Sequence, residues 1–160
     1  MKLVRYDEGD LELTEALEGD PEVMRELGGP VDRADLVDAH RRRARDNEWF
    51  FKVVLEIGGP PVGTIGIWDS EFQGTVIHEI GWMVLPAFQG RGIATGALEH
   101  LIERARAEPR FERIHAFPAV SNAPSNALCR RSGFELTGEC DFQFRDRTLR
   151  CNHWELEVAH

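Results

Sequence analysis

Residues 78–95 read HEIGWMVLPAFQGRGIAT, and this stretch predicts a strand, a short loop and the start of a helix. In its first part, alternation places three apolar side chains on one strand face: Ile80, Trp82 and Val84. Pro86 ends the strand because it lacks the N–H group that a sheet ladder needs. From Ile93 onward the apolar period changes from two residues to about 3.6, which is typical of an amphipathic helix.

The loop between the two elements is rich in glycine. Residues 89–92 read QGRG and directly precede the predicted helix. Free backbone N–H groups and the positive end of the helix dipole converge at such a position, which favours an anion, best of all a phosphate. Gly90 and Gly92 would let the backbone approach the ligand closely, and Arg91 adds a charged donor.

Length and charge limit the function classes. The 160 residues predict a single domain over 1–160 that is long enough to bury a proper core. A net charge of −9 argues against a nucleic-acid partner. The same charge favours cationic substrates, or it simply keeps the protein soluble.

The sequence also predicts a cytoplasmic protein. No apolar run approaches the length of a membrane span, and residues 1–8 lack the apolar core of a signal peptide. We therefore expect no membrane partner. The three cysteines lack ligand spacing and are expected to be reduced thiols: Cys129, Cys140 and Cys151. Cys140 and Cys151 would be neighbours across a hairpin.

The whole chain predicts an α/β (α+β) fold, with a mixed, mostly antiparallel sheet of six to seven strands flanked by about four to five helices. The expected strands cover residues 3–6, 49–57, 62–68, 76–85, 113–118, 134–144 and 148–158. The expected helices cover residues 10–18, 21–27, 32–45, 93–105 and 123–132. Residues 69–75 are predicted to be a polar connection. One right-handed crossover would pass through the helix that begins at Ile93.

Other phosphate ligands fit the glycine-rich loop less well. Residues 90–96 match a dinucleotide fingerprint superficially, but a hairpin rather than a βαβ unit precedes them. The strand at 113–118 also ends without the acidic residue that would bind a ribose. No lysine and serine pair follows the glycines, which argues against a nucleotide triphosphatase.

Two motifs carry a resemblance to a known family. Gln89-x-x-Gly92-x-Ala94, after a strand that ends Met83-Val84-Leu85-Pro86, resembles the coenzyme A pyrophosphate loop of the GNAT superfamily of N-acetyltransferases. Asn122-x-x-Ser125 with the later Gly133-Phe134 resembles the next block of that family. Within the family, the sequence from Glu79 to Trp82 is most similar to the branch that acetylates ribosomal-protein N-terminal alanine or serine.

The resemblance implies a GNAT fold and acetyl-CoA as cosubstrate, with no metal. It implies that the pantetheine arm binds the backbone of three residues as an added strand: Met83, Val84 and Leu85. It implies that the pyrophosphate binds the amides of Gln89, Gly90, Arg91, Gly92, Ile93 and Ala94 and the hydroxyl of Thr95. Asn122 and Ser125 would contact the pantetheine or the adenosine side.

Glu79 is the candidate general base, acting through a water. An alkyl amine with a pKa near about 10 is mostly protonated at pH 7, so acetyl transfer needs a proton acceptor. Glu79 lies on the central strand, near where several family members carry a catalytic Glu. The alternative is a structural carboxylate bonded to nearby backbone. His78 is a weaker candidate because strand alternation points it to the other face.

The sequence departs from the family at the general acid. Many members carry a tyrosine on the late helix, where this chain has Cys129, and its only tyrosine is Tyr6. Cys129 is therefore the candidate that protonates the departing thiolate. The alternatives are that Cys129 only packs, and that Ser125, a water or unassisted thiolate departure completes the reaction.

The expected activity is transfer of acetyl from acetyl-CoA to a primary amine by direct attack in a ternary complex. The amine would belong to a protein N-terminus or to a small molecule. The rival hypothesis is a non-catalytic acetyl-CoA sensor or interaction module of the same fold. A homodimer is possible, because dimers are common among relatives. The histidines outside the central strand show no metal-ligand spacing: His40, His100, His115, His153 and His160.

Overall fold

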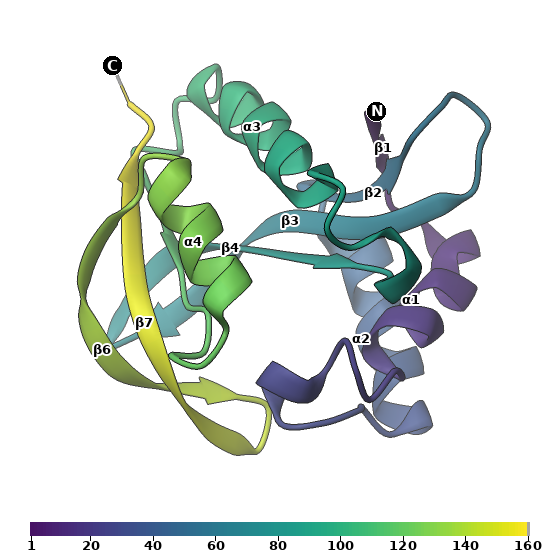
Figure 1. The fold of residues 1–160 in the computed structure, drawn as a ribbon, viewed down its shortest axis with the longest axis horizontal. Coiled ribbons are helices and arrows are strands. Elements are labelled where there is room, and N and C mark those ends of the chain that lie inside the picture. The colour runs from purple at the N-terminus through teal and green to yellow at the C-terminus, as the bar shows by residue number, and fades with distance from the viewer. Residues whose placement is uncertain (160) are drawn as a thin grey trace.

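The computed structural model describes residues 1–159, and His160 lies outside the described part. One seven-stranded sheet runs through the molecule in the order β1-β2-β3-β4-β5-β7-β6 (Figure 1). Every pairing is antiparallel except β4 with β5. The expected mixed, mostly antiparallel α/β architecture is confirmed.

The elements have the following bounds. The strands are β1 Lys2–Arg5, β2 Phe50–Val54, β3 Pro61–Phe72, β4 Thr75–Val84, β5 Arg113–Ala116, β6 Glu135–Phe144 and β7 Arg147–Glu157. The α-helices are α1 Leu11–Glu18, α2 Arg33–Asp46, α3 Ile93–Arg106 and α4 Ala123–Arg131. Short 3-10 turns are η1 Glu8–Asp10, η2 Arg25–Leu27 and η3 Pro86–Phe88.

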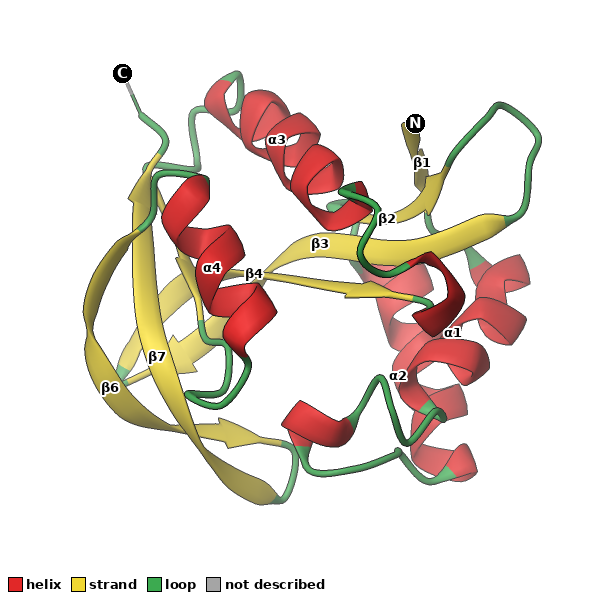
Figure 2. Cartoon of the chain, viewed as in Figure 1, coloured by secondary structure: helices red, strands yellow, loops and turns green. Residues whose placement is uncertain are grey.

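Helices cover both faces of the sheet. Figure 2 shows α3 and α4 on one face, with α1 and α2 behind β2 and β3 on the other. The core between α3 and the sheet is built from alternating strand residues and the apolar helix stripe, which include Ile65, Ile67, Ile80, Leu98 and Leu101. Full burial of each such side chain stabilises the fold by about 1.5–3 kcal/mol. Among the described residues, no helix has the length and apolarity to cross a bilayer.

Two predicted boundaries are wrong. Residues 69–75 are not a connection, because β3 continues to Phe72 and β4 begins at Thr75. Gln73 and Gly74 join them with φ values of 52° and 79°, as a tight two-residue hairpin turn requires. The polar residues that suggested a loop are solvent-facing positions on long strands.

The second predicted helix is also wrong. Asp20 caps the turn as expected, since its side chain accepts hydrogen bonds from Glu22 N at 2.8 Å and Val23 N at 3.0 Å. However, the segment forms only turns and η2, and Gly28 and Gly29 end it with φ values of 88° and 102°.

The pairing between β4 and β5 is short. Glu79 of β4 lies opposite His115 of β5, and β5 already ends at Ala116. On its other side β4 stays paired with β3 as far as Val84. The carboxyl-terminal half of β4 therefore has one edge without a neighbouring strand, and this opening positions the site described below.

Asn126 joins α4 to the sheet. This buried side chain donates to Ala119 O at 2.9 Å and Asn122 O at 2.8 Å. Its Oδ1 accepts from Asn152 Nδ2 at 2.9 Å and Trp154 Nε1 at 2.8 Å. Sequence patterning missed this residue, because its partners lie on a distant strand.

We expect Asn126→Ala to destabilise the fold by about 2–3 kcal/mol, because it leaves the buried Trp154 N–H without an acceptor. Asn152→Ala removes only one of these hydrogen bonds and should cost about 1 kcal/mol. Urea unfolding of both variants measures the difference. Equal destabilisation would contradict a bridging role for Asn126.

Candidate active site

The glycine-rich loop forms an open turn at the start of α3. Gly90 and Gly92 have φ values of 75° and 74°, which favour glycine, and a Cβ on either would meet open space. The first α-helical bond runs from Gly96 N to Gly92 O at 3.1 Å. The N–H groups of residues 93–95 precede that bond and have no acceptor within the helix. This geometry fits an anion at the helix N-terminus.

Two arginines add positive charge beside this turn. Arg91 is exposed and its guanidinium lies 5.2 Å from the ring centroid of Phe88. Arg131 reaches over from α4, with Nη2 at 3.4 Å from Oγ1 of Thr95. Sequence patterning missed Arg131, because only the packing of α4 beside the start of α3 brings it here.

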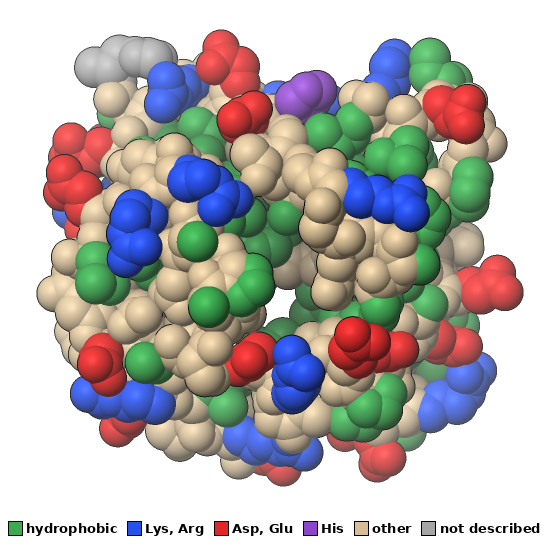
Figure 3. Space-filling model, in the orientation of Figure 1, with side chains coloured by type: hydrophobic (Ala, Val, Ile, Leu, Met, Phe, Trp, Pro, Cys, Tyr) green, Lys and Arg blue, Asp and Glu red, His purple; other side chains and the backbone are tan. Residues whose placement is uncertain are grey.

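The free edge of β4 leads through η3 into the glycine-rich turn. Met83, Val84 and Leu85 are all half-buried. Leu85 N still donates to Val62 O of β3 at 2.9 Å, whereas the Val84 carbonyl accepts from Gln89 Nε2 at 3.0 Å. Figure 3 shows a hollow through the middle of this face, lined partly by apolar side chains, between the region of β4 and that of α4.

Asn122 and Ser125 lie at the start of α4, on the opposite side of the opening. Asn122 is the N-cap, and its Oδ1 accepts from Ser125 N at 3.2 Å. Both side chains are half-buried. The carboxamide oxygen of Asn122 thus stabilises the helix start, which leaves its Nδ2 and the Ser125 hydroxyl as the groups that can meet a ligand.

Glu79 lies where β4 and β5 begin to diverge. Burial raises the pKa of Glu79 from 4.5 to about 7, and hydrogen bonding to the side chains of Ser70 and Trp68 opposes the shift only in part. A carboxylate with this pKa matches the protonation state that a general base needs near neutral pH. The expected position of Glu79 on the face of β4 opposite Ile80 is confirmed.

Trp68 forms a wall beside Glu79. It lies directly opposite Glu79 in the β3–β4 ladder. A Cβ on Gly81 would come within 2.6 Å of the Trp68 ring, so the indole lies over that glycine. The glycine thereby allows a large apolar surface to pack next to the carboxyl group, and this surface excludes water from it.

Cys129 does not face the opening. Its side chain has no exposed surface and belongs to the core under α4. Burial raises the pKa of the Cys129 thiol to about 12, which makes it a poor proton donor. This corrects the expectation that Cys129 protonates the thiolate and supports the packing alternative. Tyr6 does not replace it, since its buried hydroxyl bonds Thr14 and His40.

The N-terminal half and the last hairpin meet across the far side of the opening. Arg145 Nη2, in the β6–β7 turn, lies 3.5 Å from Glu18 Oε1 of α1, and Ser121 Oγ donates to Glu26 Oε2 at 2.6 Å. A cavity of about 240 Å³ lies at this junction, between η2 and the hairpin. These contacts close a ring of structure around the hollow.

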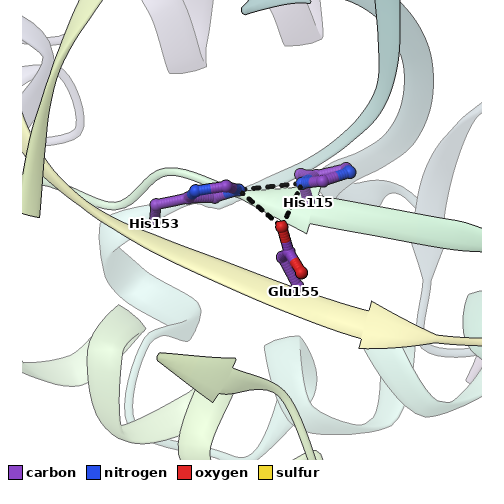
Figure 4. Close-up of side chains that lie close together, drawn as sticks. All are labelled: His115, His153 and Glu155. Atoms are coloured by element: carbon purple, nitrogen blue, oxygen red, sulfur yellow. Dashed lines mark hydrogen bonds and ion pairs between the residues drawn. The ribbon is translucent and has the colours of Figure 1, made fainter. Parts of the chain in front are cut away.

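Sequence patterning also missed a cluster beside Glu79. Figure 4 shows His115 of β5 and His153 and Glu155 of β7 pointing toward one another. Burial lowers the pKa of both imidazoles. The one local signal was the His-x-Glu spacing at 153–155, which places both side chains on one strand face.

Cys140 and Cys151 are opposite one another as expected, and all three cysteines are free thiols.

Residues 1–135 match the acetyltransferase (GNAT) domain family. The chain belongs to this family. The match includes the glycine-rich turn, the free edge of β4 and the start of α4, so the observed geometry and the GNAT fold agree.

Individual GNAT relatives differ in what they act on. The chain is 34% identical over 114 residues to L-methionine sulfoximine/L-methionine sulfone acetyltransferases of Pseudomonas paraeruginosa and Pseudomonas aeruginosa, covering 69% of this chain. It spans 64% of the length of these curated relatives. Ribosomal-protein-alanine N-acetyltransferase from Brucella melitensis superposes with a TM-score of 0.75 and 27% identity, over 98% of this chain and 99% of that one. Microcin C7 self-immunity acetyltransferase MccE, in complex with acetyl-CoA and AMP, gives 0.75 and 19% identity, over 97% and 91%.

The raised pKa of Glu79 predicts a pH-dependent cost to stability. The folded state holds the Glu79 proton up to about pH 7, whereas the unfolded chain releases it near pH 4.5. Stability therefore falls as the pH rises between these values, by up to about 3 kcal/mol. Glu79→Gln removes this dependence. The free energy of unfolding of the variant, relative to that of the wild type, should therefore increase between pH 5 and pH 8. Urea unfolding at both pH values measures it.

Glu71→Gln is the matched control, since Glu71 is an exposed carboxylate on β3. The difference between this variant and the wild type should not change with pH. If the Glu79→Gln difference were equally constant, the Glu79 carboxyl would not be desolvated as described.

Proposed function

We propose that this GNAT protein is an acetyl-CoA-dependent N-acetyltransferase that acts on the α-amine of an amino acid or of a protein N-terminus. The observation that carries the proposal is Glu79, a carboxyl group with a pKa raised to about 7. It lies at the mouth of the opening between β4 and β5. The edge of β4 leads from there to a phosphate-binding turn, so a base and a coenzyme site are joined by one strand.

The coenzyme would lie along this strand and its turn. Its pyrophosphate would accept hydrogen bonds from the N–H groups of residues 89–94 and from Thr95, with Arg91 and Arg131 adding positive charge. The pantetheine arm would add to the free edge at residues 83–85. Asn122 Nδ2 and the Ser125 hydroxyl would contact it from α4. The structure of MccE with acetyl-CoA supports the use of this fold for that ligand.

The reaction would be a direct attack in a ternary complex. Glu79 accepts a proton from the substrate ammonium through a water, and the free amine attacks the thioester carbonyl carbon. The C–N bond forms and the C–S bond breaks. The coenzyme leaves as a thiolate, and the acetylated nitrogen loses its second proton, which reaches the thiolate through a water or the Ser125 hydroxyl and gives the amide and the free thiol. Cys129 has no part in this proposal, because its buried thiol does not reach the opening.

We propose an α-amine as the acceptor because its pKa lies closer to that of Glu79 than the pKa of a lysine-like amine does. A peptide α-ammonium has a pKa of about 8, whereas a lysine-like ammonium has one of about 10.4. A base with a pKa near 7 therefore takes a proton more readily from the α-ammonium of a protein N-terminus than from a lysine-like ammonium. The free amino acid enters the proposal through the relatives. The two named kinds of relative agree with this, since methionine sulfoximine and an N-terminal alanine both present an α-amine.

The phosphate-binding turn has a direct test. We expect Gly92→Leu to weaken acetyl-CoA binding by about tenfold or more, or about 1.4 kcal/mol, because the side chain would project where the pyrophosphate binds. Gly74→Leu is the control, since Gly74 has a similar φ of 79°, against 74° for Gly92, and equally open surroundings. Calorimetry measures both affinities. If both variants bound acetyl-CoA with equal affinity, the pyrophosphate would not bind at Gly92.

Thiol release from acetyl-CoA tests the activity and the acceptor together. The panel contains peptides with N-terminal alanine or serine, free amino acids including methionine sulfone, polyamines and an aminoglycoside. We expect release with α-amines and little with polyamines. In the wild type, kcat should rise with pH to a plateau above an apparent pKa near 7. Glu79→Gln should lower kcat at pH 7 by about 100-fold or more and shift this rise upward.

Three outcomes would contradict parts of the proposal. Release with polyamines alone would reject the α-amine. An unchanged pH profile in Glu79→Gln would remove Glu79 from the mechanism. Silence across the panel, in protein that binds acetyl-CoA, would instead favour the non-catalytic sensor.

A further inference from the structure

We propose that His115, His153 and Glu155 form a binding site for a divalent transition-metal ion of the zinc type. The three side chains come from neighbouring strands, β5 and β7, and face one another on the sheet surface (Figure 4). They present the combination of two imidazoles and one carboxylate that zinc sites with an open fourth position often use. Acetyl transfer as proposed above has no role for this cluster, so the site is a separate property.

The distances between the three ligand atoms suit one ion. His115 Nδ1 lies 2.8 Å from His153 Nε2, and each lies 3.6 Å from Oε1 of Glu155. Bond lengths of about 2.0–2.2 Å at tetrahedral angles separate neighbouring ligand atoms by roughly 3.3–3.5 Å. The three atoms therefore approximate one triangular face of a zinc tetrahedron, and small side-chain rotations complete it.

Surrounding groups hold the ligands in these orientations. The His153 ring stacks on Phe117 at a centroid distance of 4.7 Å and meets Phe72 edge-on at 4.9 Å. Arg113 Nη1 lies 3.8 Å from Oε2 of Glu155, so the other carboxylate oxygen faces the two imidazoles. Arg113 is thus a polar outer partner of the ligand Glu155, and losing such a partner typically costs about 10- to 100-fold in metal affinity.

The protons also suit metal binding. His115 Nδ1 and His153 Nε2 lie 2.8 Å apart, so one imidazole donates its hydrogen to the other. On binding, that hydrogen moves to the second nitrogen of the same ring. Both facing nitrogens then offer lone pairs, Glu155 offers a carboxylate oxygen, and no redox partner is required.

The cluster can be reached from solvent. A cavity of about 260 Å³ borders it, and its lining includes Phe72, Cys140, His153 and Glu155. An ion can enter there, and a water can occupy the fourth position. The chain's net charge of −9 further favours the approach of a cation.

Titration of the chelator-treated full chain, without a histidine tag, tests the proposal. We expect one equivalent of Zn²⁺ to bind in competition with a chromophoric chelator and to raise the Tm. One equivalent of Co²⁺ should give the visible absorption of a tetrahedral site. His153→Gln and Glu155→Gln should each weaken Zn²⁺ binding by more than the roughly 10- to 100-fold that the loss of an outer partner costs.

Two further variants separate this site from adventitious binding. His100→Gln removes an exposed histidine of α3 and should bind Zn²⁺ as the wild type does. Arg113→Gln keeps all three ligands and should weaken binding by only about 10-fold. Equal affinities of the wild type and a folded His153→Gln variant would overturn the proposal. These readouts do not depend on acetyl transfer, so failure here and failure of the proposed function are distinguishable.

Discussion

The parting of β4 from β5 is the constraint on which the rest of the site depends. The two strands meet where Glu79 lies opposite His115, and β5 ends one residue later. An unpaired strand edge exposes a row of N–H and C=O groups. Here that edge borders the hollow seen in Figure 3 and leads through η3 into the glycine-rich turn. A single break in pairing thus creates room for a ligand and aligns it with an anion-binding helix end.

The same break gives Glu79 its chemistry. At the junction the carboxyl group is still surrounded by strands on both sides, and Trp68 covers the neighbouring Gly81. Desolvation therefore dominates over its hydrogen bonds and sets the pKa near 7. The partly buried Glu79 therefore lowers the stability of the fold, as is typical where function requires a perturbed pKa.

The sequence predicted what depends on local pattern. The strand, the glycine-rich turn and the helix from Ile93 follow from periodicity and from Pro86, and Glu79 follows from strand alternation. Features set by contacts between distant segments were missed. Arg131 reaches Thr95 only because α4 packs beside the start of α3. Nothing local distinguishes an exposed His115 from one that meets His153 across β5 and β7.

Errors in the prediction have related causes. The polar composition of residues 69–75 predicts a loop. The structure has the ends of two long strands and a tight turn there, and solvent-facing strand ends have the same polar composition as a loop. Cys129 was assigned by its position in a motif. Its depth under α4 depends on β7, which supplies Trp154 to the same core. A match to a motif position therefore does not show whether the side chain at that position is buried or exposed.

Charge explains how an acidic chain can hold an anionic coenzyme. The net charge of −9 repels phosphate at long range, but at physiological salt this field is screened beyond about 8 Å. Within that distance the turn presents Arg91, Arg131 and the N–H groups at the start of α3. In the proposed coenzyme site these local groups would therefore govern the pyrophosphate, despite the acidic net charge.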